Sequence, residues 1–110
     1  MQVLFIDDHE VIWSGMKGVV ERLVAQQRPG EPFDWHCTRD LAAAMALPLQ
    51  APDLILMDYH LPGVTGLDAL AALRERFESA PVVVVSGDQR PDHIRRAIEA
   101  GAAGFIPKTM

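Results

Sequence analysis

The sequence Val3–Asp8 (VLFIDD) places two adjacent carboxylates directly after four apolar residues. Three more short apolar runs end in a polar residue, and these are Leu54–Asp58 (LILMD), Val82–Ser86 (VVVVS) and Phe105–Lys108 (FIPK). Short, continuous apolar runs are typical of strands that are buried on both faces of a parallel sheet. The carboxyl ends of parallel strands meet at one edge of such a sheet, where ligands bind. The sequence therefore predicts that three carboxylates, a hydroxyl and an ammonium group gather at one edge.

The length and composition indicate a single domain that spans residues 1–110. Hydrophobic residues make up 49% of the chain and charged residues 23%, as is typical of globular proteins. The net charge of −5 argues against nucleic-acid binding by this segment, because phosphate contacts need lysine and arginine. Cys37 is the only cysteine, so no internal disulfide can form, and the apolar runs are too short for a signal peptide or a membrane span. We therefore expect a cytoplasmic protein without membrane contact.

Helical patterns separate the predicted strands. The first covers residues 10–27, and the apolar side chains of its buried stripe recur at helical spacing: Ile12, Met16, Val19, Val20 and Leu23. A short edge strand is expected at residues 33–37. Thr38 is then expected to cap a second helix, which continues to about Leu47.

Two further helices complete the alternation. Thr65 and Asp68 have the spacing of a capping box at the start of the third helix, after a loop in which Pro62 and Gly63 suit a type II turn. Pro91 suits the first turn of the fourth helix, whose inward-facing residues are expected to be Ile94, Ala97 and Ile98. Alternating strands and helices predict an α/β fold with a parallel sheet, and right-handed crossovers place helices on both faces of that sheet.

The alternation predicts one more helix after a fifth strand at Gly104–Ile106, but the chain ends at Met110. We therefore expect a domain that is truncated after strand five. In such a domain the first helix lacks a companion on its face of the sheet. The apolar surface left bare there would be a liability or a contact surface.

The three acids at the strand ends predict a metal site. Asp7, Asp8 and Asp58 are expected to lie in one cleft, where carboxylates repel each other unless a cation lies between them. Oxygen ligands favour a hard divalent ion, and Mg²⁺ (or Mn²⁺) leaves positions for water and phosphate. A carboxylate can attack phosphorus and form an aspartyl phosphate, whose oxygens Ser86 and Lys108 would help to neutralise. An acid pair alone at a strand end can equally be a helix cap, so the inference depends on the whole set.

Together these residues resemble the receiver domain of bacterial two-component response regulators. The resemblance covers the chain from Val3–His9 through Met57–Gly63 to Ala103–Lys108, with the acidic pair, the lone acid, the hydroxyl and the lysine in family order. It implies a flavodoxin-like (CheY-like) fold with five parallel strands in the order 2-1-3-4-5. The first and last segments look most like regulators whose output is a LuxR/NarL-type helix-turn-helix domain, which would lie outside this chain.

The resemblance implies a role for each site residue. Asp58 would accept a phosphoryl group from a phosphohistidine on a sensor histidine kinase. Asp8 would ligate Mg²⁺ directly, Asp7 largely through water, and His60 through its backbone carbonyl. Lys108 would pair with a phosphoryl oxygen.

The resemblance also implies a switch. The Ser86 hydroxyl would move toward the phosphoryl group, and Phe105 would turn inward, where many members of the family have a tyrosine. His60 and Asp88 would tune the lifetime of the phosphate. Plain core packing of Phe105 and ordinary loop solvation of the other two side chains stay open as alternatives.

The kinase is expected to dock against the first helix and the site loops, with Trp13 as a candidate contact. The alternative for Trp13 is a residue at the margin of the core. The resemblance also allows a homodimer. His9, His36 and His93 are too scattered along the chain to predict a metal site of their own.

Two other functions stay open beside a phosphorylation-controlled switch. One is a receiver-like interaction module that does not use phosphate, whose usual signature is the loss of an acid or of the lysine, and here none is lost. The other is a phosphohydrolase of the haloacid-dehalogenase type, which needs a second aspartate where this chain has His60. We expect the switch, which assists only its own phosphorylation and dephosphorylation and is not a stand-alone enzyme.

Overall fold

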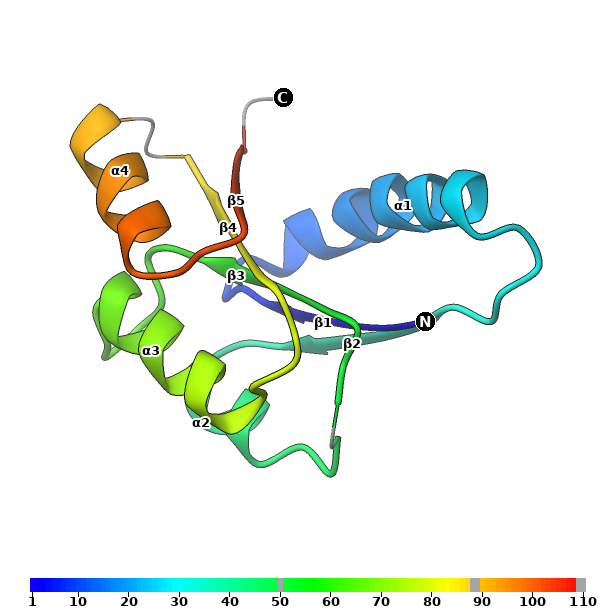
Figure 1. Ribbon diagram of the computed structural model, residues 1–110, viewed down its shortest axis with the longest axis horizontal. Helices are drawn as coiled ribbons and strands as arrows, with labels where there is room; N and C mark the ends of the chain where they lie inside the picture. The colour runs from blue at the N-terminus through cyan, green and yellow to red at the C-terminus, as the bar shows by residue number, and fades with distance from the viewer. Residues whose placement is uncertain (50, 88–89, 109–110) are drawn as a thin grey trace.

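Strands and helices alternate along the chain in the computed structural model, which describes residues 1–49, 51–87 and 90–108 (Figure 1). The elements are β1 (Gln2–Ile6), α1 (Glu10–Gln27), β2 (Asp34–Thr38), α2 (Leu41–Met45), β3 (Leu54–Asp58), α3 (Gly66–Arg76), β4 (Val82–Ser86), α4 (Pro91–Glu99) and β5 (Gly104–Pro107). The five strands form one parallel sheet in the order β2-β1-β3-β4-β5. The predicted α/β fold and its strand order are confirmed.

Helices cover both faces of the sheet, with α2, α3 and α4 on one face and α1 on the other (Figure 1). The strand β1 shows why its apolar run is continuous. Its residues Leu4 and Ile6 pack toward α2 and α3, while Val3 and Phe5 pack toward α1, and all four are fully buried. No helix in the described part of the chain is long and apolar enough to cross a membrane.

The strand register brings the polar strand ends to one edge. Asp58 pairs with Val85 across β3 and β4, and the Lys108 backbone N–H donates to the Ser86 carbonyl at 2.8 Å. On the other side, the Asp7 backbone N–H donates to a carbonyl at the end of β2 at 3.0 Å. The edge predicted from the sequence therefore exists, and four strands contribute to it.

The start of α2 differs from the prediction. Asp40 caps the helix, because its side chain accepts a hydrogen bond from a backbone N–H of the first turn at 2.8 Å. Thr38 is instead the last residue of β2, where it pairs with Ile6 in the sheet and is buried. The predicted cap at Thr38 was wrong because a residue held in the strand ladder cannot also begin a helix. The helix α2 is also shorter than expected, since it ends before Leu47.

The start of α3 agrees with the prediction. The Thr65 hydroxyl accepts a hydrogen bond from the Asp68 backbone N–H at 3.1 Å. In the preceding loop, Gly63 has a φ of 76°, which is the conformation that the third position of a type II turn requires. The loop after β3 therefore contains the turn and ends in the helix cap that the sequence predicts.

Two residues of the predicted α1 stripe are exposed, Val19 by 44% and Leu23 by 55%. Among the described elements α1 is the only helix on its face of the sheet, so these side chains have no neighbouring helix to pack against. Leu23 lies instead at an open apolar hollow that is also lined by Met1, Val20, Val24, Leu54, Leu56, Val83 and Ile106. This hollow is the bare surface that the sequence predicted.

The prediction that Ile98 faces inward was also wrong, since this residue of α4 is 46% exposed. Ala97 is the residue of α4 that is fully buried. Consecutive residues of a helix point about 100° apart. A helix that rests on the sheet through the small side chain of Ala97 therefore turns Ile98 away from the core.

Gly66, the first residue of α3, packs directly against Tyr59. A Cβ added at Gly66 would lie 2.6 Å from both the backbone oxygen and the ring of Tyr59, closer than real Cβ atoms approach. We expect Gly66→Ala to lower the free energy of unfolding by about 1–3 kcal/mol, because the overpacked loop has to shift. The matched control is Gly18→Ala in α1, where an added Cβ meets nothing within 4 Å. This control should raise the free energy of unfolding by roughly 0.5–1 kcal/mol.

Urea unfolding of the two glycine variants measures this difference. Equal free energies of unfolding for Gly66→Ala and Gly18→Ala would show that the loop at Tyr59 yields without cost, contrary to the prediction.

Candidate functional site

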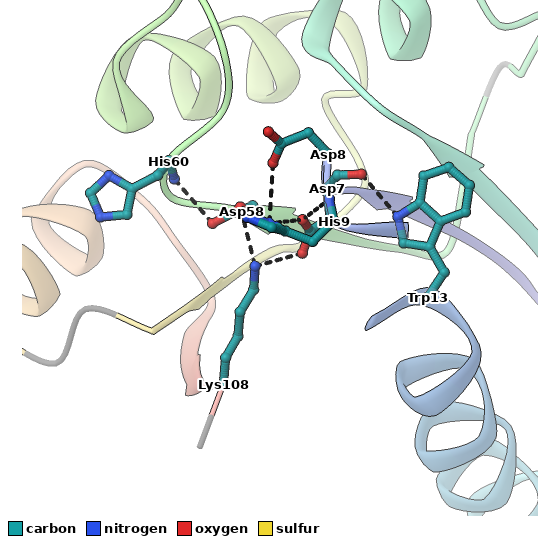
Figure 2. Close-up of polar contacts among 7 residues, drawn as sticks. All are labelled: Asp7, Asp8, His9, Trp13, Asp58, His60 and Lys108. Carbon is teal, nitrogen blue, oxygen red and sulfur yellow. Dashed lines mark hydrogen bonds and ion pairs between the residues drawn. The ribbon is translucent and has the colours of Figure 1, made fainter. Parts of the chain in front are cut away.

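Polar side chains from three strand ends meet at the carboxyl edge of the sheet (Figure 2). Asp7 and Asp8 follow β1, Asp58 ends β3, and Lys108 follows β5. Asp7 and Asp58 are buried, with exposed fractions of 0% and 2%, whereas Asp8 is exposed. The structure therefore brings together these four predicted residues, which are up to about a hundred positions apart in the sequence.

The Lys108 ammonium joins the two buried carboxylates. Its Nζ lies 2.6 Å from Asp7 Oδ2 and 3.1 Å from Asp58 Oδ2, and its side chain is only 10% exposed. Within the described ranges the ammonium is the partner of both carboxylate oxygens, since no other group there donates to them. A buried carboxylate is costly without a charge partner, so the ammonium is what holds this pair of acids together.

The His9 ring faces the same group of acids (Figure 2). Its Nδ1 lies 2.8 Å from Asp7 Oδ1, 3.2 Å from Asp8 Oδ1 and 3.6 Å from Asp58 Oδ2. The hydrogen bond with Asp7 raises the pKa of His9, and the negative charges of Asp7 and Asp8 raise it further, against smaller opposing effects of burial and Lys108.

The residues at this edge fit a divalent cation. One ligand atom from each of Asp7, Asp8, His9 and Asp58 lies within 4.8 Å of the others. Three carboxylates against one ammonium leave an excess of negative charge, and two of the carboxylates are buried. Carboxylate oxygens are the ligands that Mg²⁺ and Mn²⁺ prefer, so the donor set matches the ion predicted from the sequence.

Backbone and indole N–H groups hold the acids in place. The His9 backbone N–H donates to Asp7 Oδ1 at 2.8 Å, and the His60 backbone N–H donates to Asp58 Oδ1 at 3.1 Å. The Trp13 indole N–H donates to the Asp7 carbonyl at 2.9 Å, while its ring packs against the core under α1. Trp13 is therefore a residue at the margin of the core, as one alternative predicted, and it also anchors the loop that carries the acid pair.

The other predicted residues lie around this group. Ser86 is fully buried at the end of β4, next to the strand that ends in Asp58. Phe105 is partly buried and packs against the core on the α2–α3–α4 face. His60 is exposed, and its ring meets the edge of the Tyr59 ring at 5.2 Å between centroids. The metal-binding role of the His60 carbonyl stays a prediction, and Asp88 lies outside the described residues.

The sequence did not predict that His9 belongs to the site. The histidines of the chain are scattered in sequence, which hid the fact that one of them belongs to the acid group. The available signal was local, because His9 directly follows the acid pair at the end of a buried strand. A residue in that position is carried to the same edge as the acids themselves.

Comparisons with known proteins give consistent results. A family model described as "Response regulator receiver domain" matches residues 3–110. The chain is 32% identical over 108 residues to the nitrate/nitrite response regulator protein NarL of Escherichia coli (strain K12). The matched part is 98% of this chain but 48% of that relative, so the chain spans about half the length of this curated relative.

Two solved structures extend the comparison. The signal receiver domain of the putative response regulator NarL from Mycobacterium tuberculosis is 32% identical, with a TM-score of 0.69, and the match covers 98% of this chain and 83% of that chain. A response regulator protein from Burkholderia pseudomallei, solved with a phosphorylated aspartic acid, a calcium ion and citrate, is 25% identical with a TM-score of 0.71. That match covers 98% of this chain and 59% of the other chain.

Proposed function

The chain belongs to the response regulator receiver family, and on this premise we propose that it is a phosphoacceptor switch of a two-component system, with Asp58 as the acceptor. The observation that carries the proposal is the setting of Asp58. Its carboxylate is buried at a strand end, with Oδ2 3.1 Å from the Lys108 ammonium and next to the acid pair that fits a divalent ion. A relative of similar fold was solved with a phosphorylated aspartic acid and a calcium ion, which supports this chemistry.

In the proposed transfer, an Asp58 carboxylate oxygen forms a bond to phosphorus. The bond between phosphorus and the imidazole nitrogen of a phosphohistidine breaks, and its electron pair stays on that nitrogen. Asp8, Asp58, Asp7 through water and the His60 carbonyl would hold Mg²⁺, which would neutralise charge on the phosphoryl oxygens. The His60 backbone N–H orients Asp58 through Oδ1, so the carboxylate needs no rearrangement before it reacts.

The residues around Asp58 then respond to the new charge. Lys108 already lies within ion-pair distance of Asp58 and is the cation that meets a phosphoryl oxygen. The Ser86 hydroxyl, at the end of the adjacent strand, follows the phosphoryl group, and Phe105 moves inward from its partly buried position. Phosphorylation shifts the population toward this arrangement because the phosphoryl group contacts it better than the resting one. The lifetime of the phosphate is tuned at His60 and Asp88.

The proposed receiver function also implies the partners of the chain. The donor is a sensor histidine kinase that docks against α1 and the site loops, where Trp13 is a candidate contact beside its role in holding Asp7. The curated relatives are about twice as long as this chain, which supports control of a separate DNA-binding output domain. A homodimer is compatible with this class of regulator, and the chain acts as a signalling module and not as a stand-alone enzyme.

The test of the proposal is phosphorylation by a small donor. The purified chain is incubated with Mg²⁺ and acetyl phosphate, and its intact mass is compared with that of a sample that contains a chelator. We expect the mass of one phosphoryl group, which is absent when the metal is removed.

The same experiment separates the alternatives. A folded chain without the adduct would contradict the proposal and support a receiver-like module that does not use phosphate. Continuous release of inorganic phosphate from an added phosphate monoester would instead support a phosphohydrolase.

A further inference from the structure

We propose that His9 is a metal ligand through Nδ1, and that this nitrogen raises the affinity of the site for borderline transition-metal ions, such as Ni²⁺, relative to its affinity for Mg²⁺. The inference rests on the proposed function, because it assumes that the cation lies between these carboxylates. It assigns a residue and an ion preference that the acid set alone does not supply.

The first argument is the position of the ring. His9 Nδ1 contacts one oxygen of Asp7 at 2.8 Å and one of Asp8 at 3.2 Å, and lies 3.6 Å from Asp58 Oδ2. A single nitrogen is thus close to all three carboxylates that would hold the cation (Figure 2). A cation that bonds to these oxygens must therefore either bond to Nδ1 or displace the ring.

The second argument is that the ring is held in this direction. His9 precedes the first residue of α1, at a position where side chains commonly cap the helix, but in the described structure its side chain makes no capping hydrogen bond. Its backbone N–H and its ring instead contact the same oxygen, Asp7 Oδ1, each at 2.8 Å. The Trp13 indole N–H, from α1, donates to the Asp7 carbonyl at 2.9 Å. The short loop that carries the His9 ring is therefore also tied to α1. Bonding of Nδ1 to a metal ends the ring's hydrogen bond with Asp7, but it leaves the backbone contact intact and the ring in its present position.

The third argument is the chemistry of the nitrogen. The ring faces the carboxylates with Nδ1, which bears a proton when it donates to Asp7 and loses it when it bonds to a metal. The side chain of His9 is 54% exposed, so the displaced proton passes to water. Imidazole is a good ligand for Ni²⁺ and Zn²⁺, whereas Mg²⁺ prefers oxygen and retains its waters. Adding His9 to the three carboxylates therefore strengthens binding of Ni²⁺ more than binding of Mg²⁺.

The test compares metal binding by the unphosphorylated wild-type chain and by two variants, His9→Ala and the control His36→Ala on β2. Calorimetric titration measures the Mg²⁺ dissociation constant, and displacement of Ni²⁺ by Mg²⁺ shows that both ions use one site. We expect His9→Ala to weaken Ni²⁺ binding by roughly tenfold or more, since even groups beyond the direct ligands change metal affinity by about 10–100-fold. Mg²⁺ binding should change much less. The ratio of the two constants should be unaltered in His36→Ala, whose ring is not among the clustered ligand atoms.

A spectroscopic measurement on the Mn²⁺-loaded chain tests ligation directly. Electron spin echo experiments detect a ¹⁴N nucleus bonded to Mn²⁺, and we expect this coupling in the wild type and in His36→Ala but not in His9→Ala. Circular dichroism confirms that each variant is folded.

The outcomes distinguish this inference from the proposed function. If His9→Ala binds Ni²⁺ and Mg²⁺ with an unchanged ratio, or binds both more tightly, the ring only occupies the place of the cation and the inference is overturned. Mg²⁺ binding without a ¹⁴N coupling in the wild type would overturn the inference and leave the proposed function intact. If the folded wild type binds neither ion, both fail.

Discussion

The variant Asp58→Asn is expected to form no phosphoryl adduct under conditions in which the wild-type chain forms one. A neutral amide lacks the charged oxygen that attacks phosphorus, so the covalent step is lost and not merely slowed. The replacement keeps the size of the side chain and its capacity to accept the His60 N–H at Oδ1. Intact-mass measurement after incubation with Mg²⁺ and acetyl phosphate checks the result.

The fold of Asp58→Asn should survive, because Lys108 keeps its contact with Asp7 at 2.6 Å. Its free energy of unfolding should be no lower than that of the wild type in the absence of metal, since a buried negative charge has been removed. The matched control is Asp68→Asn, an exposed acid in the first turn of α3, which should be phosphorylated normally. A full-sized adduct on folded Asp58→Asn would assign the phosphoryl group to another residue.

Replacing Lys108 with alanine is expected to lower the free energy of unfolding by about 3–5 kcal/mol in metal-free buffer, the usual cost of breaking a buried ion pair by removing one partner. The ammonium faces both Asp7 and Asp58, whose exposed fractions are 0% and 2%, so its loss leaves these two buried carboxylates with only the half-exposed His9 ring beside them. Phosphorylation should also be slowed, because the group that meets the phosphoryl oxygen is gone. Urea unfolding in the presence of a chelator measures the first effect.

Divalent cations should partly reverse the loss of stability in Lys108→Ala. A ligand that binds only the folded state adds about 2.7 kcal/mol at a hundred times its dissociation constant. The gain from Mg²⁺ should be larger in the variant than in the wild type, because the ammonium and the cation share the same carboxylate oxygens. The control is Lys17→Ala, an exposed lysine of α1, which should change stability by less than about 0.5 kcal/mol. Equal stabilities of the two lysine variants would mean that the ion pair contributes nothing to the fold.

Local sequence was sufficient for most of the fold and for the acid edge. The continuous apolar run of β1 predicted a strand buried on both faces, and Val3, Leu4, Phe5 and Ile6 are indeed fully buried. The alternation of helices and strands then required a parallel sheet, which brings the carboxyl ends of the strands to one side. The residues Asp7, Asp8, Asp58 and Lys108 could be placed there because each directly follows or ends a strand.

The errors concern residues whose environment depends on other elements. Thr38 has the chemistry of a helix cap, but its pairing with Ile6 holds it in β2. Leu23 has the spacing of a core residue, but its exposure of 55% depends on which helices share its face of the sheet. Helical periodicity predicts the direction of a side chain and not the presence of a neighbour on that side.

The sequence by itself determined the alternation of strands and helices and the edge at which the acids meet, and the resemblance to receiver domains added the order of the strands in the sheet. Only the tertiary structure decided that the Lys108 ammonium bridges Asp7 and Asp58, and that His9 Nδ1 stands close to all three carboxylates. The physical reason is that strand periodicity constrains a residue to a strand end, whereas contacts at a few ångströms depend on how the loops after different strands turn toward one another.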